Sequence, residues 1–386
     1  MMTSKPPLKK WLGNLSLIGI SVIIALLVAE YVVRAAKPQN LVTPITSYVF
    51  RNDAEVDYLF KPHLDRIFRQ GDFEVRVISN SIGISDAEIL PRKGPNELRI
   101  LVLGDSFTWG GYTGDITHGY PRFLERTLRQ HQSLSATTVR VVNAAIPGYG
   151  TRQELKMYLK LRKAVQPDIV ILGFFMGNDF YDNAGLTRHT VVNDYLINRQ
   201  SLGPTTGLRV LLFQHSHLYR LLELWNPVST RSAPYYHGMR LTFFDDAEHD
   251  FDNASRLTQK YLDALLATTV RDKVHLLVVL IPDRLQLDPQ LAESSAERLG
   301  LDFSHWSPER PHLAVLAWLA ENRVPFMDLV PVFFDSHSEL GYDRIYAGYN
   351  QHTSRVGNEL IAAALARSVL DLDLEVARGF RERKRQ

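Results

Sequence analysis

The chain has 386 residues, of which 45% are hydrophobic and 22% are charged, a composition typical of globular proteins that argues against disorder. Its 44 basic and 42 acidic residues leave a net charge of +2, so nothing in the charge indicates nucleic acid as a partner. The lack of cysteine excludes a thiol nucleophile, disulfide bonds and cysteine metal sites, and it fits an oxidising compartment.

The amino-terminal segment predicts a membrane anchor. Lysines within residues 1–10 precede a run from Trp11 to Ala29 that contains no charged residue. That length suits a membrane-spanning helix better than a cleaved signal, and Leu27-Val28-Ala29 is a poor cleavage pattern. We therefore predict a cytoplasmic segment at 1–10 and an uncleaved signal anchor at 11–33. The basic flank then places the remainder on the periplasmic or extracytoplasmic side of the inner (cytoplasmic) membrane. A cleaved signal peptide is the alternative.

Residues 34–96 read as a juxtamembrane linker followed by a small β extension. The linker is polar and contains Pro38 and Pro44. Phe73 to Ile78 alternates apolar and polar residues, as a half-buried strand does. Asn80-Ser81-Ile82-Gly83 has the composition of a turn. We expect no chemistry from this segment.

From Arg99 onward, strand and helix patterns alternate, which predicts an α/β fold with a doubly wound, five-stranded parallel sheet. The first of these strands, Ile100-Leu101-Val102-Leu103, is a continuous apolar run of the kind that is buried on both faces. An irregular insertion at 181–252 contains one amphipathic stretch, Leu208 to Trp225. The main domain is assigned to residues 97–372 and a basic tail to 373–386. The other strands are expected at 139–143, 168–175, 274–281 and 325–330, and the last three helices at 255–268, 311–321 and 354–369.

Side chains suited to catalysis follow the ends of these strands, where open parallel sheets bind ligands. Ser106 follows the first strand, where its hydroxyl is placed to attack a ligand or, alternatively, to cap a helix. Gly148 follows the second strand and either lets its N–H approach a ligand or forms an ordinary turn. Asn178 follows the third, as an amide donor to an oxyanion or as a helix cap. His352 precedes the last helix, as a general base for Ser106 or as a surface or capping histidine.

Four ordered blocks carry a resemblance to a known superfamily. They are GDSFTWG at 104–110, NAAIPGYG at 143–150, Gly-Asn-Asp at 177–179 and a histidine before the last helix. In this order they resemble the SGNH/GDSL hydrolase superfamily, which implies a flavodoxin-like core. Three further blocks are similar to its membrane-anchored bacterial members, namely Ala29-Glu30, Asn80-Ser81-Ile82-Gly83 and Ile281-Pro282-Asp283-Arg284.

The resemblance implies a role for each candidate residue. Ser106 is the expected nucleophile and His352 its general base, while the Ser106 N–H, the Gly148 N–H and the Asn178 amide form the oxyanion hole. The family usually places an aspartate two or three residues before the histidine, where this chain has Tyr349 and Asn350. Asn350 can orient an imidazole but cannot stabilise an imidazolium as a carboxylate does. The alternatives are a backbone carbonyl, or a carboxylate from elsewhere, at Asp335 or Asp343.

The expected function is that of a serine esterase or O-acyltransferase that works through an acyl-enzyme. Its substrate would be an acyl ester, such as an acetylated envelope polysaccharide, a class that follows from the resemblance alone. The alternative, which Asn350 favours, is a catalytically degenerate domain that binds a glycan or acts as a scaffold in an envelope assembly. No cofactor or metal is expected, because dinucleotide, phosphate-loop and His-Glu-x-x-His motifs are absent from the sequence. Asp335-Ser336-His337 and His215-Ser216-His217 are weaker candidates for a catalytic pair and a metal site.

Overall fold

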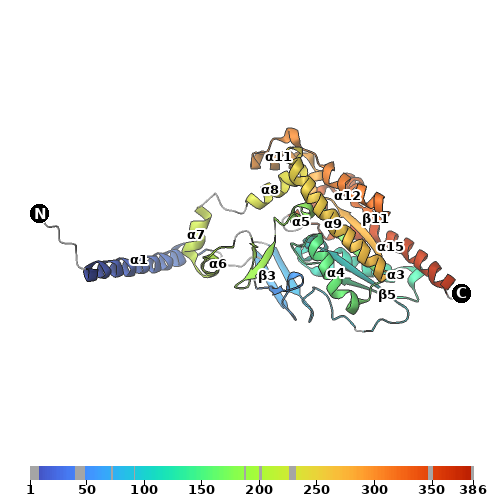
Figure 1. Ribbon diagram of the computed structural model, residues 1–386, viewed down its shortest axis with the longest axis horizontal. Coiled ribbons are helices and arrows are strands. Elements are labelled where there is room, and N and C mark those ends of the chain that lie inside the picture. Colours follow the sequence, from blue (N-terminus) through green and yellow to red (C-terminus); the bar gives the residue numbers. More distant parts are fainter. Residues whose placement is uncertain are drawn as a thin grey trace. The chain divides into compact units, whose positions relative to one another are not determined.

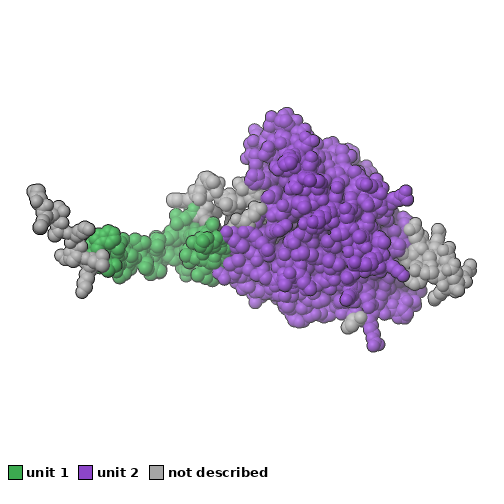
Figure 2. Space-filling model, viewed as in Figure 1, with its two compact units in different colours: residues 1–43, 203–230 green, residues 44–202, 231–386 purple. Residues whose placement is uncertain are grey.

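The computed structural model describes residues 8–39, 48–70, 73–90, 92–186, 188–199, 202–225, 232–346 and 351–383. The chain forms two compact units, which are coloured separately in Figure 2. The smaller unit comprises residues 1–43 and 203–230, and the larger comprises residues 44–202 and 231–386.

The larger unit is built on a five-stranded parallel sheet (Figure 1). Its strands follow the order β11 (Phe326–Asp328), β10 (His275–Ile281), β7 (Ile169–Phe175), β5 (Glu97–Gly104) and β6 (Thr138–Asn143). In the register between them, Leu101 of β5 lies opposite Val142 of β6, and Leu103 lies opposite Leu172 of β7. Every residue of β7 is buried, as expected for a strand that is covered on both faces. The predicted doubly wound α/β sheet is confirmed.

Helices pack against both faces of this sheet, because successive residues of each strand point to opposite sides and both sets are apolar. Leu101 contributes to one core and its neighbour Ile100 to the other. The core that contains Leu101 is completed by α4 (Thr151–Val165), α9 (Glu248–Asp272) and α12 (Glu309–Asn322). The core that contains Ile100 is completed by α3 (Tyr120–Gln130), α13 (Leu329–Leu340) and α15 (Arg355–Arg383).

Shorter elements connect this framework. Antiparallel pairs are formed by β1 (Phe50–Asp53) with β2 (Asp57–Phe60), β3 (Asp65–Gln70) with β4 (Phe73–Ile78), and β8 (His189–Val192) with β9 (Tyr195–Asn198). The short α-helices are α2 (Ser106–Trp109), α5 (Asp179–Asn183), α8 (Ser232–Phe243), α10 (Arg284–Leu287), α11 (Pro289–Leu299) and α14 (Tyr342–Ile345). Turns of 3₁₀-helix occur at Gly111–Thr113, Ile116–His118, Gln132–Leu134, Asp245–Ala247 and Phe303–His305.

The structure differs from the sequence-based expectation in the insertion and at two helix ends. The expected amphipathic stretch at 208–225 consists of two helices, α6 (Thr206–His215) and α7 (His217–Trp225), because Ser216 between them is extended. α9 begins at Glu248 rather than Ser255, with Glu248 and Asp250 in its first turn, where acidic side chains stabilise a helix. The backbone of α15 stays helical to Arg383, beyond the predicted end at Val369.

The smaller unit contains α1 (Leu8–Ala36) together with α6 and α7. Over Trp11–Ala36, α1 is long and apolar enough to cross a membrane. Its apolar side chains are exposed along this stretch, Leu17 and Leu27 each by 64%. The stretch includes the predicted anchor at 11–33.

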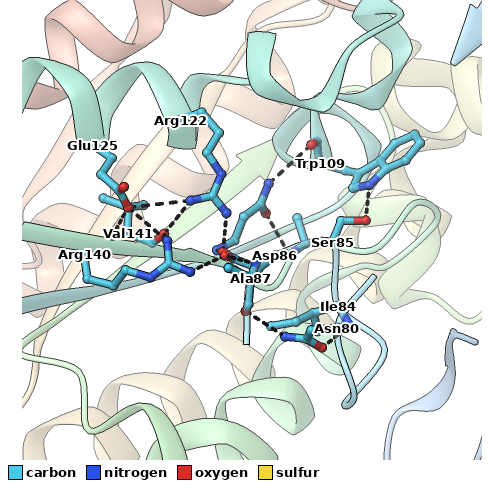
Figure 3. A network of polar contacts seen from close by, with 12 residues as sticks. Asn80, Ile84, Ser85, Asp86, Ala87, Trp109, Arg122, Glu125, Arg140 and Val141 are labelled. Carbon is cyan, nitrogen blue, oxygen red and sulfur yellow. Dashed lines mark hydrogen bonds and ion pairs between the residues drawn. The ribbon is translucent and has the colours of Figure 1, made fainter. Parts of the chain in front are cut away.

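A polar network connects the segment before β5 to the elements around it (Figure 3). The buried Asp86 carboxylate accepts hydrogen bonds from the backbone N–H groups of Ala87 and Asn143, each at 2.6 Å. It also forms ion pairs with Arg122 of α3 and Arg140 of β6. We expected this segment to be a small β extension without chemistry of its own, and in the structure its Asp86 binds side chains of α3 and β6.

The same segment also contacts the helix that begins at Ser106. Ser85 accepts a hydrogen bond from the Trp109 indole N–H at 2.8 Å, and Asn143 donates from its side-chain amide to the Trp109 carbonyl at 3.3 Å. These bonds fix α2 and the end of β6 relative to each other.

Asn80 holds the preceding turn, because its side-chain oxygen accepts hydrogen bonds from the N–H groups of Ile82, Gly83 and Ile84.

Replacing Asp86 with alanine is expected to destabilise the protein by about 1–3 kcal/mol, because the Asn143 N–H loses its acceptor and Arg122 and Arg140 keep only their ion pairs with Glu125. Denaturant unfolding of the full chain in detergent micelles measures the change. Asp65→Ala is the matched control, since its ion pair with Arg76 is exposed, with side-chain exposures of 56% and 59%, and its removal should change stability little. Equal losses in both variants would contradict the assignment.

Candidate active site

Ser106 stands at the junction between β5 and α2. β5 ends at Gly104, where an added Cβ would lie only 2.2 Å from the Thr108 hydroxyl, so the tight turn requires glycine. Asp105 caps α2, since its carboxylate accepts the Phe107 N–H at 2.8 Å. Capping is therefore the task of Asp105 and not of Ser106. As the first residue of a helix, Ser106 has a backbone N–H without an intrahelical acceptor.

His352 lies beside Ser106 although 246 positions separate them in sequence, with the imidazole Nε2 2.8 Å from the serine Oγ. The ring is sandwiched between Phe107 and Tyr112, each with its centroid 4.3 Å from that of the imidazole. His352 is only 8% exposed, so it is neither a surface histidine nor free to rotate. This geometry suits proton transfer from the hydroxyl to the ring.

Asn178 and Gly148 follow the two strands that flank β5. The Asn178 side-chain amide lies 3.4 Å from the Asp105 carboxylate and makes no capping bond to α5, the helix that it precedes. Gly148 has a φ of +79°, and an added Cβ would lie 2.9 Å from the Tyr58 hydroxyl. Because β6 and β7 both pair with β5 in parallel, Ser106, Gly148 and Asn178 all follow the same edge of the sheet.

The partner expected on the far side of the imidazole falls on residues 347–350, so Tyr349 and Asn350 lie outside the described residues. The two alternative carboxylates lie in α13 and α14. Asp343 forms an ion pair with Arg284 at 2.7 Å, with its side chain 89% exposed, and Asp335 is exposed on α13.

A cavity of about 240 Å³ adjoins the candidate site. Gly148 and Asn178 form part of its wall, and the insertion contributes His189 of β8 together with Met239 and Phe243 of α8. Asp283, which follows β10, completes one side. The mixture of apolar side chains and a few polar groups is typical of a small-molecule pocket.

Carboxyl groups with little access to solvent lie at this cavity and near the turn at Ser106. Burial raises the pKa of Asp105 from 3.8 to about 6, against the hydrogen bonds from the Phe107 N–H and Asn178, which lower it. Burial also raises the pKa of Asp283 to about 6, and the pKa of Glu154 well above its ordinary value. Among the described residues, no group of three or more histidine, aspartate or glutamate side chains is arranged to hold a metal ion.

Several residues of this region did not emerge from the sequence. Asp283 was noted only as part of a similar block, and His189 and Met239 come from an insertion without a recognisable motif. Tyr112 lies close to the Gly-Asp-Ser block, but nothing in the sequence indicates that its ring covers His352. Of the weaker histidine candidates, His337 stacks on Tyr342, and the His217 ring accepts the Gln39 N–H at 2.9 Å, both structural contacts.

Residues 102–360 match the sequence model of the GDSL-like lipase/acylhydrolase family, which is more than half of the chain. The chain therefore belongs to this family, and the resemblance to the SGNH/GDSL superfamily is confirmed. A comparison with curated protein sequences gave no match.

Three solved structures illustrate the similarity. An acetylxylan esterase from Geobacillus stearothermophilus, solved as a catalytic mutant, is 16% identical over 72% of this chain and 96% of its own, with a TM-score of 0.38. A lipase/acylhydrolase from Enterococcus faecalis is 17% identical over 70% and 95%, also with a TM-score of 0.38. A psychrotrophic esterase from Pseudoalteromonas sp. is 12% identical over 71% and 97%, with a TM-score of 0.36. These values are low, and membership in the family rests on the matched sequence model.

Asp283→Asn is expected to gain stability relative to the native chain as the pH rises from about 4 to 6. Asp283 ionises near pH 4 when unfolded but near pH 6 when folded, so the folded state binds the extra proton and its stability falls through this window. The asparagine keeps the oxygen that accepts the Leu285 N–H, and its advantage at pH 7 amounts to at most about 3 kcal/mol.

Melting temperatures of the full chain at pH 4.5 and pH 7 measure this difference. Asp302→Asn serves as the control, because this exposed aspartate also caps a short helix but has its pKa lowered by the Ser304 N–H. Its pH effect should run in the opposite direction. A pH-independent difference between native and Asp283→Asn would contradict the assigned pKa.

Proposed function

We propose that the domain at 97–372 is a serine esterase or O-acyltransferase that works through an acyl-enzyme on Ser106. The observation that carries the proposal is the 2.8 Å separation between the Ser106 Oγ and the His352 Nε2. In the proposed first step His352 takes the hydroxyl proton while Oγ attacks the ester carbonyl. His352 then returns the proton to the leaving alkoxide, which leaves the acyl group on Ser106.

Three donors are proposed to stabilise the negative charge of the tetrahedral intermediate, namely the N–H groups of Ser106 and Gly148 and the Asn178 amide. The Asp105 carboxylate supports the role, because it accepts a hydrogen bond from that amide at 3.4 Å and so holds the amide nitrogen beside the residue that precedes Ser106. Such a donor typically contributes about 3–4 kcal/mol to transition-state stabilisation.

Water or a second hydroxyl then attacks the acyl-enzyme and loses its proton to His352, which passes it to the Ser106 Oγ as the acyl–oxygen bond breaks. The first outcome is hydrolysis and the second is transfer. Met239 and Phe243 form part of the wall of the cavity of about 240 Å³, and a cavity of this size suits a short acyl group such as acetyl. The proposed ester carrier is an envelope glycan, on the strength of the resemblance to membrane-anchored members of the superfamily.

We place the protein in the inner membrane as a single-pass protein, with this domain on the extracytoplasmic side. The apolar length of α1 over Trp11–Ala36 supports the span, and the lysines that precede it support the orientation. An uncleaved anchor retains the domain at the membrane surface.

Asn350 favours a second candidate function, in which the same pocket binds a glycan without turnover. An amide in the place of the usual carboxylate leaves the imidazolium less stabilised. Retention of Ser106 and His352 at hydrogen-bond distance favours the enzyme.

A fluorophosphonate probe and an aryl acetate test for a working nucleophile in the full chain. Ser106→Ala should abolish labelling, and His352→Ala should reduce labelling and turnover by several orders of magnitude, because nucleophile and base act as a unit. Asn178→Ala should reduce turnover about 10²–10³-fold, because the oxyanion loses one of its three proposed donors. The matched control is Ser133→Ala, whose hydroxyl lies 2.8 Å from the exposed His131 ring and should be dispensable. A folded native chain that neither labels nor turns over would favour the binding protein.

Asn350→Asp is expected to raise the turnover of the aryl acetate, because a carboxylate stabilises the imidazolium that forms during attack. The reverse change in a serine protease lowers turnover about 10⁴-fold, which is an upper bound for the gain. Asn253→Asp, an identical change at an exposed position of α9, should have no effect. Unchanged turnover in Asn350→Asp would indicate that another group orients His352.

A further inference from the structure

The smaller unit brings together helices that are far apart in the sequence. Glu30, near the end of α1, accepts hydrogen bonds from the Ser216 hydroxyl at 2.7 Å and from the N–H groups of His217 and Leu218 at 3.0 and 2.8 Å. Those N–H groups belong to the first turn of α7 and have no acceptor within that helix. A carboxylate of the apolar helix therefore caps a helix that follows almost two hundred residues later.

A second set of bonds joins α1 to the end of α6. Arg34 donates both to the Glu30 carboxylate and to the carbonyl of His215, each at 3.2 Å. The Gln39 N–H donates to the His217 ring at 2.9 Å. The polar groups where α6 ends and α7 begins are thus bound to α1 as well as to each other. We call α6 and α7 together the hairpin.

The distance along the axis of α1 from Trp11 to Glu30 matches the thickness of a membrane. At 1.5 Å per residue, the helix rises about 30 Å between Trp11 and Glu30, which is the thickness of the hydrocarbon layer. Tryptophan favours the interface, so Trp11 at one boundary places Glu30 at the other, in the last turn of the predicted anchor at 11–33. An ionisable side chain at this depth requires polar partners, and the hairpin supplies them.

The hairpin also exposes apolar side chains. Leu208 and Leu211 of α6 are 57% and 48% exposed, and Leu222 of α7 is 54% exposed. Leu208 and Leu211 are three residues apart and share one face of α6, whereas Val210 is buried on another. This exposed face belongs to helices that are bound to α1 at the boundary of its apolar span. The apolar environment closest to these side chains is therefore the lipid bilayer.

We infer that the hairpin is an interfacial membrane-binding element, in which Leu208, Leu211 and Leu222 enter the outer boundary of the bilayer. The hydrogen bonds that Glu30 accepts from Ser216, His217 and Leu218, which we call the clasp, hold the hairpin against the anchor. The inference rests on the proposed membrane anchoring and not on the chemistry at Ser106. Since the hairpin lies in the segment 203–230 of the smaller unit, three chain connections rather than one then join the catalytic unit to the membrane-bound unit.

Because the chain has no cysteine, single cysteines can be introduced and labelled without background. The full chain is reconstituted into vesicles of phosphatidylethanolamine and phosphatidylglycerol, with an environment-sensitive fluorophore at L208C, L211C or L222C. We expect blue-shifted emission that lipid-attached nitroxides quench. L313C is the control, because Leu313 is 61% exposed on α12 of the larger unit and should report water.

The clasp is tested by the distance between α1 and α7, measured with spin labels at V32C and L222C. Glu30→Ala should broaden the distance distribution, because the N–H groups of α7 and the Ser216 hydroxyl lose their acceptor. Ser16→Ala is the matched control on the same helix, since its hydroxyl bonds only to the Leu12 carbonyl within α1. An unchanged distribution in Glu30→Ala would overturn the clasp.

Flotation of the vesicles separates failure of the hairpin from failure of the anchor. A chain that floats with the vesicles but whose hairpin fluorophores stay water-like and unquenched refutes the hairpin alone. A chain that does not float refutes both the anchoring and the hairpin. Emission shifts that depend on protein concentration and not on lipid quenchers would assign the face to a second copy of the chain. Fluorophosphonate labelling of Ser106 in the same samples reports the catalytic proposal separately.

Discussion

The parallel pairing of β5 with β6 and β7 is the constraint on which the rest of the structure depends. Parallel hydrogen bonding aligns the carboxyl ends of these strands, so the turns that follow Gly104, Asn143 and Phe175 emerge side by side. The candidate site residues Ser106, Gly148 and Asn178, which come from three separate blocks, thereby meet at one edge of the sheet. His352 reaches the same edge from the start of α15, which shares an apolar core with α3 and with one face of the strands.

Rigidity at this edge comes from buried polar groups. Asp105 caps α2 and also lies beside the Asn178 amide, so one carboxylate fixes two parts of the site. The Asp86 carboxylate likewise joins several elements, because Arg122 of α3, Arg140 of β6 and the Asn143 N–H all bind its oxygens (Figure 3). Among the described residues no cation forms an ion pair with Asp105 or Asp283, and burial raises the pKa of each, so ionising either carboxyl group opposes folding.

The insertion contributes to both units. Its first part, β8, and its last part, α8, supply His189, Met239 and Phe243 to the cavity beside the candidate site. Its middle part forms the hairpin that Glu30 of α1 caps. Different segments of one long insertion thus pack against different partners, some beside the cavity and others against α1.

The sequence by itself determined the parallel sheet, since uninterrupted apolar strands alternating with helical patterns have few other solutions. It also indicated Ser106, Gly148, Asn178 and His352, because glycine-bearing turns and reactive side chains directly follow strand ends. It did not predict the role of Asp86, the stacking of Tyr112 on His352, or the division of the stretch at 208–225 into two helices. Those features depend on contacts between residues that are distant along the chain. Local patterns record which face of an element is apolar, whereas only packing decides which polar group meets which partner.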